Sequence, residues 1–109
     1  MSTETENVNE RADELAARGK HKKALAMYLK SNNHQKAGEM YEQLGQVQSA
    51  VSEFSRAGNH QRGGELLRSA DMAKEAGQLF IKAGNLKEAG EVLEEAGQLV
   101  EAARQFANV

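Results

Sequence analysis

The sequence repeats itself every 13 residues along most of its length. Residues 84–89, Gly-Asn-Leu-Lys-Glu-Ala, are followed 13 positions later by Gly-Gln-Leu-Val-Glu-Ala at residues 97–102. The same interval divides residues 19–109 into seven consecutive segments without a gap, and residues 7–18 form a degenerate segment that is one residue shorter. A short, fixed period is typical of repeat proteins, in which each segment packs mainly on its neighbours.

The first position of each segment holds a residue that commonly ends a helix. These residues are Gly19, Asn32, Gly45, Gly58, Asp71, Gly84 and Gly97. Glycine, asparagine and aspartate adopt a positive φ angle more readily than other residues, and this conformation often follows the last turn of a helix. We therefore predict in each segment a helix of about ten residues that closes with a tight turn, the last of these turns being at Gly97.

Each predicted helix carries a small residue at the sixth position of the segment and a large one at the tenth. The small residues are Ala24, Ala37, Ala50, Gly63, Ala76, Ala89 and Ala102. The large residues are Tyr28, Tyr41, Phe54, Leu67, Phe80, Leu93 and Phe106. Residues four apart lie on one face of a helix, so this face should pack against neighbouring helices. Such packing is needed because helices of this length are marginal in isolation.

A second period of 26 residues pairs the segments. Glycine occupies the seventh position in alternate segments, at Gly38, Gly64 and Gly90. A glycine inside a helix costs about 1 kcal/mol relative to alanine, so its recurrence indicates close packing of the backbone at these three positions. We predict an all-α domain over residues 7–109, built as an α-solenoid of four short antiparallel helical hairpins with about eight helices. Residues 1–6 should form a flexible polar tail.

One stretch of the chain resembles the tetratricopeptide repeat. The small and large residues that carry the resemblance are Gly38, Tyr41, Gly45, Ala50, Phe54 and Ala57. Parts of this order return in the next two hairpins, as Gly64, Ala76, Phe80 and Ala83 and as Gly90, Leu93, Gly97, Ala102, Phe106 and Val109. This chain repeats at 26 residues rather than at roughly 34 and contains no proline, so it is similar to a shortened form. The resemblance implies a right-handed solenoid with a groove for an extended peptide.

A polar ladder accompanies the three glycines of the seventh position. If the helices that carry them line one concave surface, as the resemblance implies, the residues beside each glycine should face the same groove. The predicted partner-binding residues are Gln35, Glu39, Glu42, Gln61, Glu65, Arg68, Lys87, Glu91 and Glu94. Such a surface favours a protein or peptide partner of basic or amide-rich chemistry. The alternative is an ordinary solvated helix surface, where glutamate serves only its helix propensity.

The last segment differs from the others because it is more apolar. Its fourth position is Val100, where earlier segments have lysine or glutamine. Charge is also uneven, since residues 11–36 sum to +5 and residues 84–109 sum to −3. We predict as an alternative function a homo-oligomer, either a dimer or an end-to-end stack, formed through Leu99, Val100, Phe106 and Val109. A further alternative is that the sequence is a fragment of a larger solenoid.

Several classes of function are disfavoured by the sequence. Cysteine is absent, and no spacing indicates a Ser–His–acid or paired-carboxylate arrangement, so we predict a protein that is not an enzyme and has no cofactor. His21, His34 and His60 share the third position but lack a third ligand at a suitable spacing, so we interpret them as packing residues rather than metal ligands. The basic run 18–23 is interpreted as a solvated turn or one end of a head-to-tail contact, and nucleic acid is not predicted as a partner.

The chain also shows no signal for a membrane. No apolar stretch approaches the roughly 20 residues of a spanning helix, and the polar start of the sequence does not look like a signal peptide. We predict a cytoplasmic protein without membrane insertion.

Overall fold

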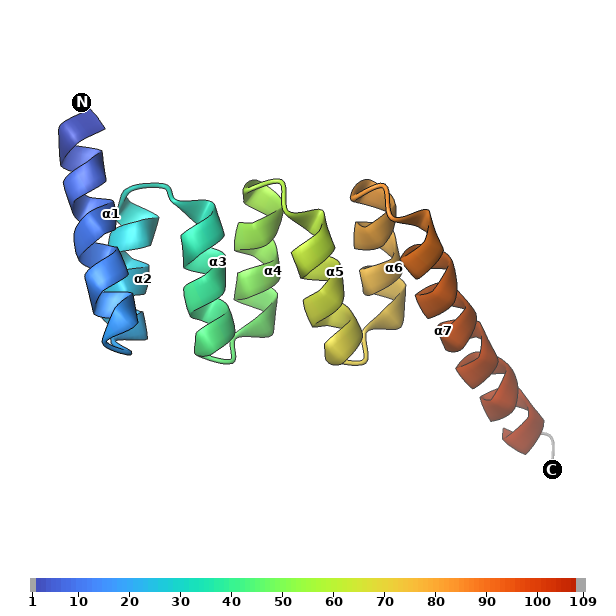
Figure 1. Cartoon of the computed structure of the whole chain (residues 1–109). Helices are drawn as coiled ribbons and strands as arrows, with labels where there is room; N and C mark the ends of the chain where they lie inside the picture. Colours follow the sequence, from blue (N-terminus) through green and yellow to red (C-terminus); the bar gives the residue numbers. More distant parts are fainter. Residues whose placement is uncertain (1, 108–109) are drawn as a thin grey trace. The chain divides into compact units, whose positions relative to one another are not determined.

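The computed structural model describes the backbone of residues 2–107 and the side chains of residues 7–97 and 107. In this part of the chain it contains seven α-helices and no β-strand (Figure 1). The helices are α1 (Ser2–Ala17), α2 (His21–Lys30), α3 (His34–Gln43), α4 (Val47–Arg56), α5 (His60–Ser69), α6 (Ala73–Lys82) and α7 (Leu86–Ala107). They form two compact units, Met1–Asn59 and His60–Val109.

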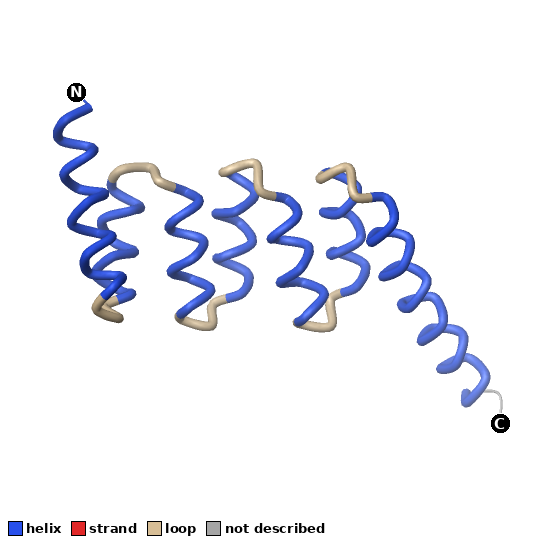
Figure 2. The backbone as a smooth tube through the Cα atoms, in the orientation of Figure 1, coloured by secondary structure: helices blue, strands red, loops and turns tan. Residues whose placement is uncertain are grey.

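Successive helices pack within each unit. In the first unit α1 contacts α2, α2 contacts α3 and α3 contacts α4, while in the second unit α6 contacts both α5 and α7. Figure 2 shows that the turns between these helices lie at alternating ends. The prediction of an all-α chain of short, successively packed helices is confirmed, and α2 to α6 each contain 10 residues.

The predicted turns form at six of the seven first positions. The backbone φ angle is positive at Asn32 (57°) and Asp71 (62°), and it lies between 76° and 80° at the four glycines. The four glycines are Gly19, Gly45, Gly58 and Gly84. After each of these residues, the next backbone N–H donates to the carbonyl five places earlier, as Gln46 does to Tyr41 (2.9 Å). In the five turns after the one at Gly19, this carbonyl belongs to the tenth-position residue. These bonds satisfy carbonyls that the end of a helix leaves without partners.

The seventh turn is not formed, and this corrects the sequence analysis. Helix α7 continues through Gly97 and contains 22 residues, so one helix replaces the two that were predicted. Gly97 is the one first-position residue that does not have a positive φ angle. At the other end, α1 begins at Ser2 and therefore includes residues 2–6, which the sequence predicted as a tail.

The core of the first unit contains the predicted small and large residues. Ala24 and Ala37 are completely buried, as is Ala12 of α1, and they surround Tyr28 together with Met40. The Tyr28 hydroxyl donates a hydrogen bond to Asp13 Oδ1. Burial, followed by the hydrogen bond and negative charge of Asp13, raises the pKa of Tyr28 well above its ordinary value of about 10.

Glycine at the seventh position allows the closest contacts between helices. A Cβ atom added to Gly38 of α3 would lie 2.9 Å from the ring of Phe54 in α4. One added to Gly64 of α5 would lie 2.7 Å from the ring of Phe80 in α6. Both rings are buried, so only a residue without a side chain fits beneath them. The predicted close packing is thus confirmed at these two glycines.

The third glycine does not behave as predicted. A Cβ atom on Gly90 of α7 would meet nothing within 4 Å, and the residue is exposed. The equivalent contact in α6 and α7 is made instead by Gly77, where an added Cβ would lie 2.7 Å from Leu93 Cγ. The prediction for Gly90 is therefore wrong, because no helix in the described part of the chain packs on this face of α7.

Candidate functional site

The predicted partner-binding residues of the first unit are bonded to their own chain. Gln35 Nε2 donates to Glu39 Oε2 (3.2 Å), and Gln35 Oε1 accepts from Asn59 Nδ2 (3.1 Å). The carboxylate of Glu39 also lies 3.6 Å from Lys36 Nζ. Glu42, half-buried, likewise has an interaction within the structure. The polar groups of this part of the ladder are therefore largely occupied by intramolecular bonds.

The second unit repeats the same network and adds a partner. Gln61 Nε2 donates to Glu65 Oε2 (3.2 Å), and Gln61 Oε1 accepts from Asn85 Nδ2 (3.2 Å). Gln61 Nε2 also lies 3.3 Å from Glu88 Oε1, which joins α5 to α7. Arg62 forms an ion pair with Glu65 (2.9 Å). Here too the ladder serves to connect helices of the same unit.

The remaining ladder residues divide into bonded and unbonded groups. Arg68 of α5 pairs with Glu95 of α7 through Nη2 and Oε1 at 3.0 Å. By contrast Lys87, Glu91 and Glu94 are exposed, and they form no hydrogen bond or ion pair with any side chain that the structure describes. Of the nine predicted residues, these three are the ones without such a bond among the described side chains.

An asparagine ladder was missed by the sequence analysis. Asn33, Asn59 and Asn85 donate through Nδ2 to a residue 24 positions earlier, which is Asn9, Gln35 or Gln61 (3.1–3.3 Å). The signal for it is visible in the sequence, because these asparagines share the second position of alternate segments and are 26 residues apart. Their regular spacing indicates a structural role in linking one pair of helices to the next.

Helix α7 exposes an apolar stripe. Leu86 is 68% exposed, and Leu93 is 39% exposed although part of its side chain packs on Gly77 of α6. Gly90 lies between these two leucines and Gly97 one turn beyond them, and a Cβ added to either glycine would meet nothing within 4 Å. The four residues are spaced i, i+4, i+7 and i+11, so they share one side of the helix. Successive helix residues are rotated by about 100°, so the residue after each of the first three stripe positions lies at one edge of the stripe. These edge residues are Lys87, Glu91 and Glu94. We call the apolar residues together with this charged edge the α7 face.

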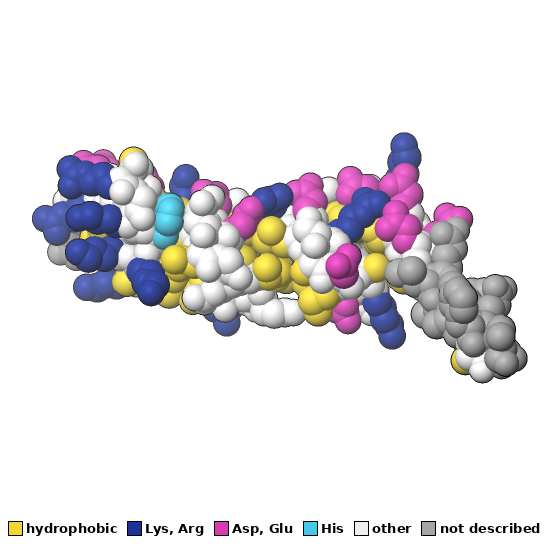
Figure 3. All heavy atoms as spheres, turned by 90° about the horizontal axis from the view of Figure 1, so that it is seen from below, with side chains coloured by type: hydrophobic (Ala, Val, Ile, Leu, Met, Phe, Trp, Pro, Cys, Tyr) yellow, Lys and Arg dark blue, Asp and Glu magenta, His cyan; other side chains and the backbone are white. Residues whose placement is uncertain are grey.

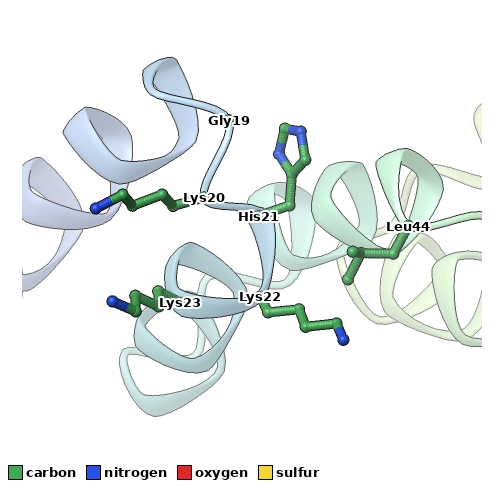
Figure 4. Close-up of a pocket in the computed structure, with 6 residues that line it drawn as sticks. All are labelled: Gly19, Lys20, His21, Lys22, Lys23 and Leu44. Carbon is green, nitrogen blue, oxygen red and sulfur yellow. The ribbon is translucent and has the colours of Figure 1, made fainter.

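A basic hollow lies in the first unit, at the turn between α1 and α2. Its volume is about 410 Å³, and its lining residues are Gly19, Lys20, His21, Lys22, Lys23 and Leu44. Figure 4 shows the side chains of Lys20 and Lys23 pointing to one side and that of Lys22 pointing to the other. Figure 3 shows Lys and Arg side chains gathered around this end of the unit. The three lysines make no ion pair among the described residues, so the hollow is open to anionic groups.

The three histidines do not gather into one site. His34 Nδ1 lies 2.8 Å from Glu53 Oε1, and the other oxygen of this buried carboxylate pairs with Arg56 Nη1 at 2.8 Å. The Nδ1 atoms of His21 and His60 are buried without a hydrogen-bond partner. The described residues contain no cluster of three or more His, Asp or Glu that could hold a metal ion.

The residues predicted for self-association lie outside the described side chains. Leu99, Val100 and Phe106 lie within the range of α7, but their side chains are not described, and Val109 is outside the described residues. Among the described residues, none of the helices has both the length and the apolar character needed to span a bilayer.

The chain was compared with models of protein families, with curated proteins and with solved structures, and none of the three comparisons gave a match. The likeness to the tetratricopeptide repeat therefore rests on the residues quoted above.

Proposed function

We propose that this chain is a non-catalytic scaffold of tetratricopeptide-like helical hairpins that binds a protein or peptide partner. The main support is the α7 face, where Leu86 and Leu93 are exposed next to charges that have no partner among the described side chains. In α3 and α5 the seventh-position glycines that correspond to Gly90 are covered by Phe54 and Phe80. The α7 face thus has the shape of a helix–helix interface without a second helix.

The chemistry of the α7 face favours an amphipathic helical partner with a basic edge. The apolar stripe has no side chain at Gly90, which leaves room for a large side chain of the partner. Glu91 and Glu94 lie at its edge without cationic partners among the described residues, so they can attract lysine or arginine. Glu39 and Glu65 are already paired with basic residues and should contribute less.

Affinity capture tests this proposal. Tagged wild-type protein and a Glu91→Lys, Glu94→Lys variant are each used to capture proteins from a cell lysate, and the captured proteins are quantified by mass spectrometry. We expect the variant to capture at least about tenfold less of a specific partner, since two attractive contacts become repulsive. Glu39→Lys with Glu65→Lys is the matched control, because it makes the same charge change at residues that are paired internally.

The opposite result, with less capture by the control than by the Glu91→Lys, Glu94→Lys variant, would contradict the proposal that the α7 face binds the partner. Loss of capture in the Glu39→Lys, Glu65→Lys control alone would place the partner on the ladder of α3 and α5 instead. Equal capture by all three proteins would remove the support for a charged binding face altogether. Circular dichroism must show the same helix content in each variant for the comparison to hold.

A second candidate function is self-association. The lysines of the basic hollow, and Glu91 and Glu94 of the α7 face, have no ion-pair partner among the described side chains, so one copy could bind the next through opposite charges. The predicted oligomer would give a molar mass in light scattering that rises with protein concentration and falls with added salt. A monomer at every concentration, unaffected by Val100→Lys, would rule out this function.

A further inference from the structure

A constant spacing relates each packing glycine to the large residue that covers it. Phe54 lies 16 residues after Gly38, Phe80 lies 16 after Gly64, and Leu93 lies 16 after Gly77. In all three pairs the glycine is at the seventh position of one segment and the large residue is at the tenth position of the next. In each case a turn with positive φ separates the two helices.

The sequence continues this relation beyond the last packed pair. The residue 16 positions after Gly90 is Phe106, and Gly97 stands at the position where the intervening turn would form. Ala102 also supplies the small residue that the sixth position requires. The segment 98–107 therefore carries the sequence features of a helix that packs on the α7 face, although in the structure it extends α7 instead.

We propose that α7 has a second, closed state in which the chain turns at Gly97 and residues 99–107 fold back as an eighth helix. In this state Phe106 packs on Gly90 in the register that places Phe54 on Gly38 and Phe80 on Gly64. The occupant of the α7 face is then a segment of the same chain. This inference concerns the chain's own helix and does not depend on the identity of any partner.

The residues at the junction allow both states. Glycine weakens a continuous helix, yet it adopts the positive φ of a turn without strain, so Gly97 lowers the barrier between them. The extended state keeps the helical hydrogen bonds across residues 94–101. The closed state gives up some of these bonds and covers Leu86 and Leu93, which are exposed in the extended state. Closure would also cover the surface proposed for partner binding, so the segment would compete with a partner.

Distances between two spin labels distinguish the states. The chain contains no cysteine, so Lys87→Cys and Ala107→Cys introduce the only two labelling sites, both at exposed positions. In a continuous helix these residues are about 30 Å apart along the axis. In the closed state they lie on adjacent antiparallel helices, whose axes are roughly 10 Å apart. We expect pulsed electron paramagnetic resonance to show a resolved short-distance population.

Two variants identify the origin of the short distance. Gly97→Ala disfavours the turn and favours the continuous helix, so we expect the ratio of closed to extended chains to fall about tenfold. Gly90→Leu fills the space that Phe106 would take, and it should have the same effect without altering the turn. A short-distance population that persists in both variants would overturn the proposal, as would its absence from the parent protein.

Dilution with an excess of unlabelled protein separates closure within a chain from exchange between chains. We expect the short distance to survive dilution, because both labels are on one chain. Its loss on dilution would mean that residues 99–107 bind a second copy, and this would overturn closure within the chain. The capture experiment with Glu91→Lys and Glu94→Lys is read independently, so the binding proposal and the closure proposal can fail separately.

Discussion

At the scale of single residues, the tenth position of a segment performs two tasks where a turn follows it. Its side chain fills the core, as Phe54 does against Gly38 and Phe80 does against Gly64. Its backbone carbonyl accepts the hydrogen bond that closes the turn. Tyr28 adds a third task through its hydrogen bond to Asp13 in α1. Substitution at this position therefore affects packing and helix termination together.

We expect Tyr28 to make the first unit less stable at alkaline pH. Its pKa is raised in the folded protein, so above about pH 10 an unfolded chain loses the hydroxyl proton while the folded chain keeps it. The stability contribution is complete below that pH and is lost as the pH rises toward the folded pKa. We expect the free energy of unfolding to fall by up to about 1.4 kcal/mol per pH unit from this one group.

Urea unfolding between pH 9 and pH 11 measures this effect. Tyr28→Phe should reduce stability at pH 7 by about 1 kcal/mol, because the hydrogen bond to Asp13 is lost, and should flatten the alkaline decrease. Tyr41→Phe is the matched control and should keep the decrease of the parent protein. An equally steep decrease in Tyr28→Phe would show that other groups, such as the lysines, are responsible.

At the scale of helices, the sequence allows α2 to α6 to be predicted but not the length of α7. A glycine at a turn position permits a positive φ angle without requiring it, and the packing of the following helix decides between turn and helix. After Gly45 and Gly84, the residue at the tenth position of the segment, Phe54 or Leu93, reaches the packing glycine before the turn, Gly38 or Gly77. The 13-residue period contains no information on whether such docking occurs after Gly97.

The candidate site shows a similar limit. Helical periodicity correctly groups Gln35 with Glu39 and Gln61 with Glu65, since each pair is bonded in the structure. It cannot show that the glutamines are also bonded to asparagines 24 residues further along the chain, because that contact depends on how pairs of helices stack. The buried carboxylate of Glu53 is equally unforeseen, since other segments have apolar residues or glutamine at that position.

At the scale of the whole molecule, one packing register serves both compact units. Gly38 with Phe54 belongs to the first unit, and Gly64 with Phe80 and Gly77 with Leu93 belong to the second. The central claim is that seventh-position glycines matter where a large side chain covers them and do not matter where the surface is open. Gly90 is a seventh-position glycine on an open surface, so it can be used to test this claim.

The most direct measurement is the free energy of unfolding, by urea, of Gly38→Leu, Gly64→Leu and Gly90→Leu. The first two should lose about 2–3 kcal/mol, because the new side chain collides with a buried ring. Gly90→Leu should change stability by no more than about 1 kcal/mol, because leucine favours a helix and meets no neighbour within 4 Å of its Cβ in the extended state, while it disfavours the closed state. Equal losses in all three variants, or no loss in Gly38→Leu and Gly64→Leu, would contradict the account.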